Sequence, residues 1–152
     1  PEDIKKSPAN IFTGTFVGEP PMNVFPARAS ISEETVCLRL NENIDLSYPA
    51  DAFSAELRAS LAGMGDIVLG VRPYAVQRRD TGSLATVVVN QWLGDQSHIA
   101  TNFAGGSLLL VEHDRTQLSE DEQIAIYLEP SDIHIFNSKT GMAISHGARL
   151  IG

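Results

Sequence analysis

DIVLGVR, at residues 66–72, is the first of a series of short apolar segments that decides the fold of this chain. The segments that follow it are LATVVVNQWLG (84–94), HIATNF (98–103), SLLLVE (107–112), IAIYLE (124–129), DIHIF (132–136) and AISHGARL (143–150). Turn-forming residues separate them at Arg79–Gly82, Gly105-Gly106 and Lys139–Gly141, and an acidic loop occupies Gln117–Gln123. Several short strands at this spacing predict an all-β barrel or sandwich.

Upstream of this series, one strand and one helix are expected. Thr35–Asn41, TVCLRLN, alternates apolar and polar residues, which predicts a half-buried strand. Ala50–Ala62 predicts a helix, because Phe53, Leu57 and Leu61 recur at every fourth position. Asp51 is the expected N-cap of this helix and Gly63 its expected end.

The N-terminal stretch leads into a rigid corner. Ser7 can cap a short helix with Pro8 at its first position, and Gly18 can end it, although IFTGTFV also permits a strand. We favour the helix. Pro20 and Pro21 lack backbone donors and fix φ, so they predict a kinked connector rather than part of a helix or paired strand.

Composition limits the classes of function. The 152 residues, 43% of them apolar, suit one domain or two small barrels that share a core. A formal net charge of −8 repels phosphate backbones and anionic lipids, which argues against nucleic acid as a partner. Cys37 is the only cysteine, which fits a reducing, cytoplasmic setting, and no apolar run is long enough to span a membrane. A chain that starts at Pro1 suggests a processed product or a piece of a longer one.

No catalytic or metal-binding pattern stands out. The four histidines have neither the i,i+4 helical spacing nor the i,i+2 strand spacing of a metal site. Glu112-His113-Asp114 is interpreted as a solvated strand end, since neighbours on a strand face opposite ways. The chain has no P-loop and no nucleophile elbow, and LSEDEQ at 118–123 has acids where a nucleotide-binding signature has glycines. We therefore expect no enzyme activity, catalytic residue, cofactor or metal in this chain.

Three stretches carry a family resemblance in order and spacing: SPANIFTGTFVGEPPMN (7–23), VLGVRPYAV (68–76) and DIHIFNSKTGMAI (132–144). Together they resemble the C-terminal regulatory region of the ATP-binding subunit of ABC importers for carbohydrates and glycerol phosphate. The resemblance implies an all-β, OB-like barrel of the transport-associated (TOBE, or MOP-like) type at 24–152. It also implies that residues 1–23 are the end of an ATPase-domain helix and the Pro-Pro linker.

The resemblance implies a regulatory and dimerisation domain without ATPase activity of its own. ATP and Mg²⁺ would bind to an ATPase domain outside this chain. The implied partners are a second copy, that ATPase domain, membrane permease subunits and a regulatory protein, at the inner face of the cell membrane. The implied linker and interface residues are Pro20, Pro21, Met22, Asn23, Arg72 and Pro73.

The sequence departs from the family pattern at three positions. Tyr74, Trp92 and Asn137 stand where relatives carry acids, so a polar network around Arg72 cannot be transferred from them. A second hypothesis is oxyanion sensing, with backbone amides at Gly105-Gly106 forming an anion nest. A third, nucleic-acid binding, has only the basic pair Arg78-Arg79 with nearby aromatic residues to support it.

Overall fold

A computed structural model describes residues 21–147, apart from the side chain of His146. The expected N-terminal helix and Pro20 lie outside the described residues. The first three strands form a meander, because each alternates buried and exposed side chains and short polar turns separate them. They are β1 (Asn23–Ile31), β2 (Thr35–Arg39) and β3 (Asp45–Pro49).

The predicted strand at 35–41 exists but ends two residues early. Val36 and Leu38 are completely buried, as its alternation requires. Leu40 and Asn41 leave the ladder because both backbone N–H groups point to the carbonyl of Ile44, which closes a turn.

The predicted helix is also present, with different ends. A 3₁₀ turn, η1 (Ala50–Ala52), comes first, and α3 (Ala55–Met64) starts after it. Ser54, not Asp51, is the N-cap, because its hydroxyl accepts the N–H of Leu57 at 3.2 Å. Gly65, not Gly63, ends the helix, because its φ of 74° suits glycine. Phe53, Leu57 and Leu61 are buried as expected.

The series that starts at residue 66 forms eight strands joined by turns and two further 3₁₀ turns. They are β4 (Asp66–Val71), η2 (Pro73–Ala75), β5 (Gln77–Arg79), β6 (Ser83–Trp92), β7 (Ser97–Phe103), β8 (Gly106–Glu112), β9 (Gln123–Tyr127), η3 (Pro130–Asp132), β10 (His134–Asn137) and β11 (Ala143–His146). The turn expected at Gly105-Gly106 lies instead at Ala104-Gly105, where both φ angles are positive. Gly106 opens β8 and pairs with Phe103.

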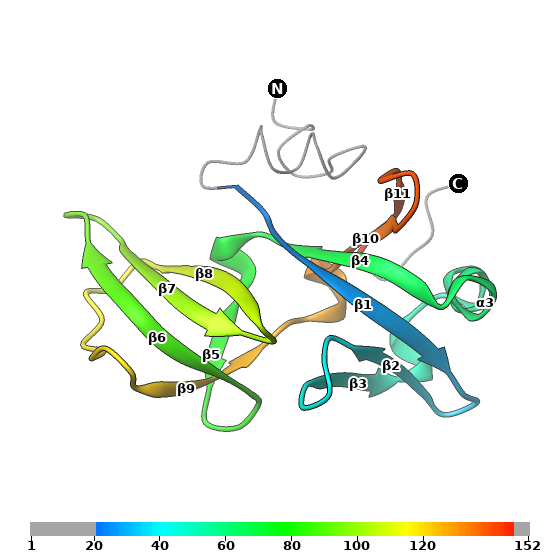
Figure 1. Cartoon of the computed structure of the whole chain (residues 1–152), viewed down its shortest axis with the longest axis horizontal. Coiled ribbons are helices and arrows are strands. Elements are labelled where there is room, and N and C mark those ends of the chain that lie inside the picture. The colour runs from blue at the N-terminus through cyan, green and yellow to red at the C-terminus, as the bar shows by residue number, and fades with distance from the viewer. Residues whose placement is uncertain (1–20, 148–152) are drawn as a thin grey trace.

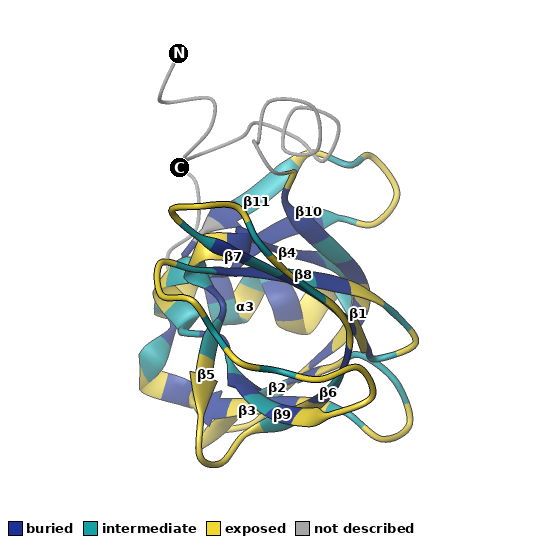
Figure 2. Cartoon of the chain, turned by 90° about the vertical axis from the view of Figure 1, so that its left-hand side faces the viewer, coloured by how far each residue is buried: buried dark blue, intermediate teal, exposed yellow. Residues whose placement is uncertain are grey.

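The strands form two antiparallel sheets that curl toward each other, one on each side of Figure 1. The first sheet has the order β11-β10-β4-β1-β2-β3, and the second has the order β5-β9-β6-β7-β8. One apolar cluster joins both sheets and α3, since it includes Leu57 of the helix, Leu69 of β4 and Leu110 of β8. Figure 2 shows buried residues along the strands and exposed residues mainly in the turns at their ends.

Pro26 occupies an unusual position inside β1. The strand pairs with β4 from Asn23 to Arg28, but β2 ends at Arg39, opposite Arg28, and does not reach Pro26. Ala29 donates its backbone N–H to Gly65 on the β4 side, so by alternation the backbone of Arg28 and Pro26 faces β2. Pro26 therefore sits at a position whose backbone nitrogen has no strand opposite it, and a sheet tolerates proline at such positions.

Candidate functional site

The three stretches that carry the family resemblance meet on adjacent strands. Asn23, at the end of the first stretch, pairs with Val71 of β4 in the second. His134, from the third stretch, pairs with Gly70 of β4 from the other side. Segments more than 100 residues apart in sequence thus converge on β10, β4 and β1, at the junction of the two sheets (Figure 1).

Gly70 allows close packing at the centre of this junction. A Cβ atom there would lie 2.4 Å from Sδ of Met22 and 3.1 Å from Cε2 of Phe136. Met22 is only 4% exposed and Phe136 is completely buried. Position 70 in the LGVRP motif therefore requires glycine, because the side chain of Met22 in the PPMN motif occupies the space that a Cβ atom would need.

Asn23 connects the two sheets through its side chain. Its Nδ2 donates to the carbonyl of Leu109 at 2.8 Å, and its Oδ1 accepts the N–H of Leu109 at 2.8 Å. Leu109 belongs to β8, an edge strand of the second sheet, whose outward backbone groups would otherwise have no strand beside them. The carboxamide thus takes the place of one residue of a neighbouring strand.

The remaining predicted interface residues fall into two groups. Arg72 and Pro73 are buried, and burial lowers the pKa of Arg72 from its ordinary value. Pro21 is exposed. Met22, Asn23, Arg72 and Pro73 therefore contribute to the interior of this chain, and of the described predicted residues only Pro21 reaches the surface.

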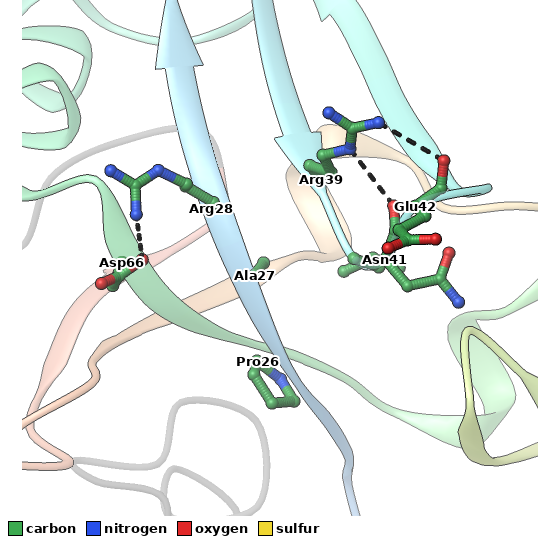
Figure 3. A pocket seen from close by; sticks show the side chains of 8 residues that line it. Pro26, Ala27, Arg28, Arg39, Asn41, Glu42 and Asp66 are labelled. Carbon is green, nitrogen blue, oxygen red and sulfur yellow. Dashed lines mark hydrogen bonds and ion pairs between the residues drawn. The ribbon is translucent and has the colours of Figure 1, made fainter.

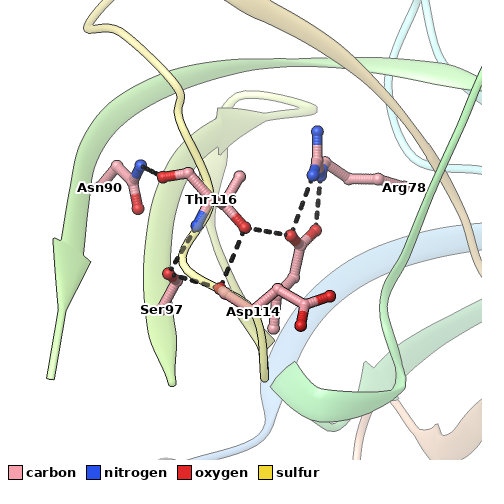
Figure 4. Close-up of polar contacts among 6 residues, drawn as sticks. Arg78, Asn90, Ser97, Asp114 and Thr116 are labelled. Carbon is pink, nitrogen blue, oxygen red and sulfur yellow. Dashed lines mark hydrogen bonds and ion pairs between the residues drawn. The ribbon is translucent and has the colours of Figure 1, made fainter. Parts of the chain in front are cut away.

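A polar network that sequence reasoning missed holds the 113–122 loop to the second sheet (Figure 4). Glu112 is not a solvated strand end. Arg78 donates from Nε to Oε2 of Glu112 and from Nη2 to Oε1, the second bond being 3.0 Å long. The hydroxyl of Thr116 donates to Oε1 as well. Ser97 donates to the carbonyl of Asp114, and Asn90 donates to that of Thr116. Arg78 and Glu112 are 34 residues apart, so no local pattern could indicate the pair.

These contacts also engage the basic pair that nucleic-acid binding would need. Besides the Arg78–Glu112 pair, Arg79 lies 3.2 Å from a carboxylate oxygen of Glu129 and 4.0 Å above the ring of Tyr127. Both guanidinium groups therefore already have acidic neighbours, which lowers the local positive potential that a phosphate backbone requires.

A pocket of about 490 Å³ opens where β1 and β2 separate (Figure 3). Pro26 and Ala27 of β1 lie along it, and Arg28 and Asp66 stand at one side. Arg39, Leu40, Asn41 and Glu42 line the other side. It exists because β1 continues past the end of β2.

Within residues 21–147, the structure holds no cluster of three or more His, Cys, Asp or Glu side chains that could bind a metal ion. No helix in that range is long and apolar enough to cross a membrane.

Comparison with known proteins finds a family match in the middle of the chain. Residues 69–136 match the family described as the TOBE domain. This part of the chain is similar to a TOBE domain. The match runs from the second half of β4 through most of β10, so it includes Gly70, Arg72 and His134 of the junction and all of the second sheet, while Met22 and Asn23 lie outside it.

Curated relatives of this chain are ATP-binding proteins of ABC transporters. It is 29% identical to ABC transporter ATP-binding protein y4oS of Sinorhizobium fredii, over 95% of this chain and 37% of the relative. It is 26% identical to the sulfoquinovosyl glycerol transport ATP-binding protein SmoE of Agrobacterium fabrum, over 95% and 39%. It is 27% identical to the sn-glycerol-3-phosphate import ATP-binding protein UgpC of Cereibacter sphaeroides, over 93% and 37%. The resemblance inferred from the three motifs is confirmed, and the chain spans less than two-fifths of these relatives' length.

A solved structure supports the fold. The cytoplasmic molybdate-binding protein ModG superposes with a TM-score of 0.53 at 14% identity, over 74% of this chain and 94% of that one. The all-β fold predicted from the strand pattern, and the OB-like architecture that the resemblance implies, are confirmed.

Proposed function

We propose that this chain is the regulatory and dimerisation module of the ATP-binding subunit of a sugar-type or glycerol-phosphate-type ABC importer. The observation that carries the proposal is similarity along 93–95% of this chain to such subunits, of which it matches 37–39%. In this proposal a separate ATPase domain binds ATP and Mg²⁺ and associates with the permease, while the module itself catalyses nothing.

The junction supports a coupling role for the start of the chain. Pro21 leads directly into Met22 and Asn23, which pack on β4 and bind β8. An ATPase domain that precedes Pro20 would therefore be tied to both sheets within three residues. A stiff connector at that point transmits orientation better than a flexible one.

The coupling role is tested in the full-length subunit by replacing Pro20 and Pro21 with glycine. We expect the module to remain folded, while the dependence of ATPase activity on the module weakens. Replacing Pro49, a proline at the far edge of the first sheet, with glycine is the matched control. Regulation that is unchanged in the Pro20/Pro21 variant would remove the coupling role.

Self-association is the second part of this proposal. The second sheet exposes large apolar side chains along β6, with Leu84 at 55%, Val88 at 41% and Val89 at 53% exposure. Val89 lies in register with Ala100 and Leu109, so an apolar row crosses three strands. A second copy that uses the same patch would bury this row in an isologous contact.

Sedimentation of the full-length subunit tests the dimer. We expect a dimer for the wild type and a shift to monomer for Val89→Lys, with Met142→Lys as a control at an equally exposed apolar residue outside β6. A wild type that stays monomeric at high concentration would overturn the dimerisation role.

Small-anion binding is a second candidate function. The fold neighbour ModG is a molybdate-binding protein, and this chain shares its architecture. Calorimetry with molybdate, tungstate, sulfate and phosphate tests the candidate, and the absence of heat and of a thermal shift for all four would exclude it. The net charge of −8 acts against anions at long range, so a local cationic site would be needed.

A further inference from the structure

Four charged residues form a row across the first sheet. Asp66 of β4 pairs with Arg28 of β1, Arg28 pairs with Arg39 of β2, and Arg39 pairs with Asp45 of β3. The outer contacts are ion pairs of 2.9 Å for Arg28–Asp66 and 3.4 Å for Arg39–Asp45. The two arginines at the centre occupy directly opposite positions, where like charges are unfavourable, and Figure 3 shows their side chains turned to opposite sides.

The two arginines flank the pocket at the end of β2. Figure 3 shows their side chains on opposite sides of Ala27, with Pro26 further along the opening. Since β2 turns away after Arg39, no strand fills the space beside Pro26. The two arginines therefore stand beside an open surface pocket whose volume is within the usual range of small-molecule sites.

The acidic partners of both arginines are easily exchanged, and Arg39 is held in addition by hydrogen bonds of 3.3 Å to the backbone carbonyls of Asn41 and Glu42 (Figure 3). The side chains of Arg28 and Asp66 are 70% and 68% exposed, and those of Arg39 and Asp45 are 57% and 47% exposed. Exposed ion pairs of this kind add little to stability because water screens them. One anionic group that contacts both guanidinium groups would gain two charge-assisted contacts and would also remove the repulsion between them.

The rest of the lining narrows the class of ligand. Exposed Pro26 and half-buried Leu40 offer an apolar surface for the carbon skeleton of a small molecule, while Ala27 is buried in the core. Oδ1 of Asn41 accepts the backbone N–H groups of Asn43 and Ile44, which leaves its Nδ2 group as a donor for hydroxyl oxygens. The lining also holds the carboxylates of Glu42 and Asp66, so the phosphate has to replace Asp66 at Arg28. Glu42 would accept hydroxyl groups and repel a second anionic group. These features fit a polyol that carries a single phosphate.

We propose that the pocket between β1 and β2 binds a small phosphorylated polyol, with its phosphate between Arg28 and Arg39. The proposal rests on the anion-binding candidate function and gives it a place and a ligand class. It is independent of the regulatory function, because the pocket lies apart from the junction at Asn23 and Gly70.

Calorimetry and amide NMR titration of the 152-residue chain test this proposal, with sn-glycerol 3-phosphate, inorganic phosphate and uncharged glycerol as probes. We expect saturable binding of glycerol phosphate that weakens as salt is added, with shifts at Ala27 and Arg39, weaker binding of inorganic phosphate and none of glycerol. Equal binding of inorganic phosphate and glycerol phosphate would overturn the proposed ligand class.

Three variants that each remove one positive charge test the location of the site. Arg28→Gln and Arg39→Gln should each weaken glycerol phosphate binding at least fivefold. Arg79→Gln, which removes an ion-paired arginine of the second sheet, should leave it unchanged. Binding that persists in both first-sheet variants, or that falls equally in all three, would overturn the site while anion binding by the chain still stands. No binding of any anion to the wild type would overturn both.

Discussion

The carboxamide of Asn23 and the backbone of Leu109 exchange two hydrogen bonds of 2.8 Å, and this pair joins the two sheets of the barrel. Leu109 is on an edge strand, and Asn23 is the first residue of β1 in the other sheet. A second such link runs from the hydroxyl of Tyr48, in β3, to the carbonyl of Leu128, just after β9. The two sheets are thus connected by side chains at separate points as well as by the apolar core.

Removing the Asn23 carboxamide should destabilise the chain. Asn23→Ala leaves the N–H and C=O of Leu109 without their partner, so we expect the free energy of unfolding to fall by about 2 kcal/mol. Asn23→Asp should be no better, because a carboxylate can accept from the N–H but repels the carbonyl oxygen. Urea unfolding measures both, with Asn102→Ala, an exposed residue of β7, as the control. A loss no larger than the control's would refute the role of the link.

Met22 and Gly70 should be energetically coupled. Gly70→Ala places a methyl group where Sδ of Met22 lies, and we expect a cost of about 1–3 kcal/mol from overpacking. Met22→Ala opens that space at the cost of a cavity. In the double variant the new methyl group enters the cavity. The loss of unfolding free energy in the double variant should therefore be smaller than the sum of the losses in the two single variants. Strict additivity in a double-mutant cycle of unfolding would mean that the two residues do not share this space.

The hydroxyl of Tyr48 should matter for stability and for alkaline titration. Tyr48→Phe removes the 2.6 Å hydrogen bond to Leu128 in a buried setting, and we expect a loss of about 1–2 kcal/mol, compared with almost none for the exposed Tyr74→Phe. Burial, and then the nearby Tyr127 and Glu129, raise the pKa of Tyr48. A raised pKa adds stability that is complete below the unfolded value near 10 and is lost as pH rises further.

Ultraviolet absorbance, recorded as pH is raised, follows the ionisation of tyrosine directly. Tyr48 should ionise only when the chain unfolds. Ionisation of Tyr48 near pH 10 without unfolding would contradict the buried hydrogen bond.

Glu112 should make the second sheet sensitive to acid. Burial alone would raise the pKa of Glu112, but hydrogen bonds from Arg78 and Thr116 outweigh it and hold the pKa below its ordinary value. A lowered pKa contributes stability that is present above the unfolded value near 4.3 and is lost as pH falls through the folded value. We therefore expect Glu112→Gln to cost about 1–2 kcal/mol at pH 7 and much less at pH 3.

Urea unfolding at both pH values checks this, with Glu33→Gln, an exposed loop residue, as the control. A cost for Glu112→Gln that is the same at pH 3 as at pH 7 would show that the lost stability does not come from the ionised carboxylate.

Much of the fold could be predicted from local patterns. Each element was identified correctly from its apolar spacing: the alternation in 35–41 and the repeat of Phe53, Leu57 and Leu61. This works because an element that buries one face carries apolar residues at the period of that face. Element ends were less accurate: Asp51 and Ser54 are both good N-caps, and only the backbone path decides that Ser54 accepts from Leu57.

The candidate site was only partly predictable. The resemblance indicated Met22, Asn23 and Arg72 together as linker and interface residues, a role that stays a prediction. Their burial at the junction of two sheets was not part of that prediction. The bond from Asn23 to Leu109 joins residues 86 positions apart, and the Arg28–Arg39 pair depends on strand register. Neither relation leaves a periodic signal in a single sequence.

Pro26 has a consequence for misfolding. Sliding β2 along β1 by two residues would keep every side chain on its proper face, so hydrophobic burial alone does not forbid the slip. The slipped strand would, however, reach Pro26, which has no N–H to offer, and one carbonyl of β2 would lose its partner. The proline nitrogen therefore disfavours this misregistered pairing of β1 and β2, which hydrophobic burial alone would allow.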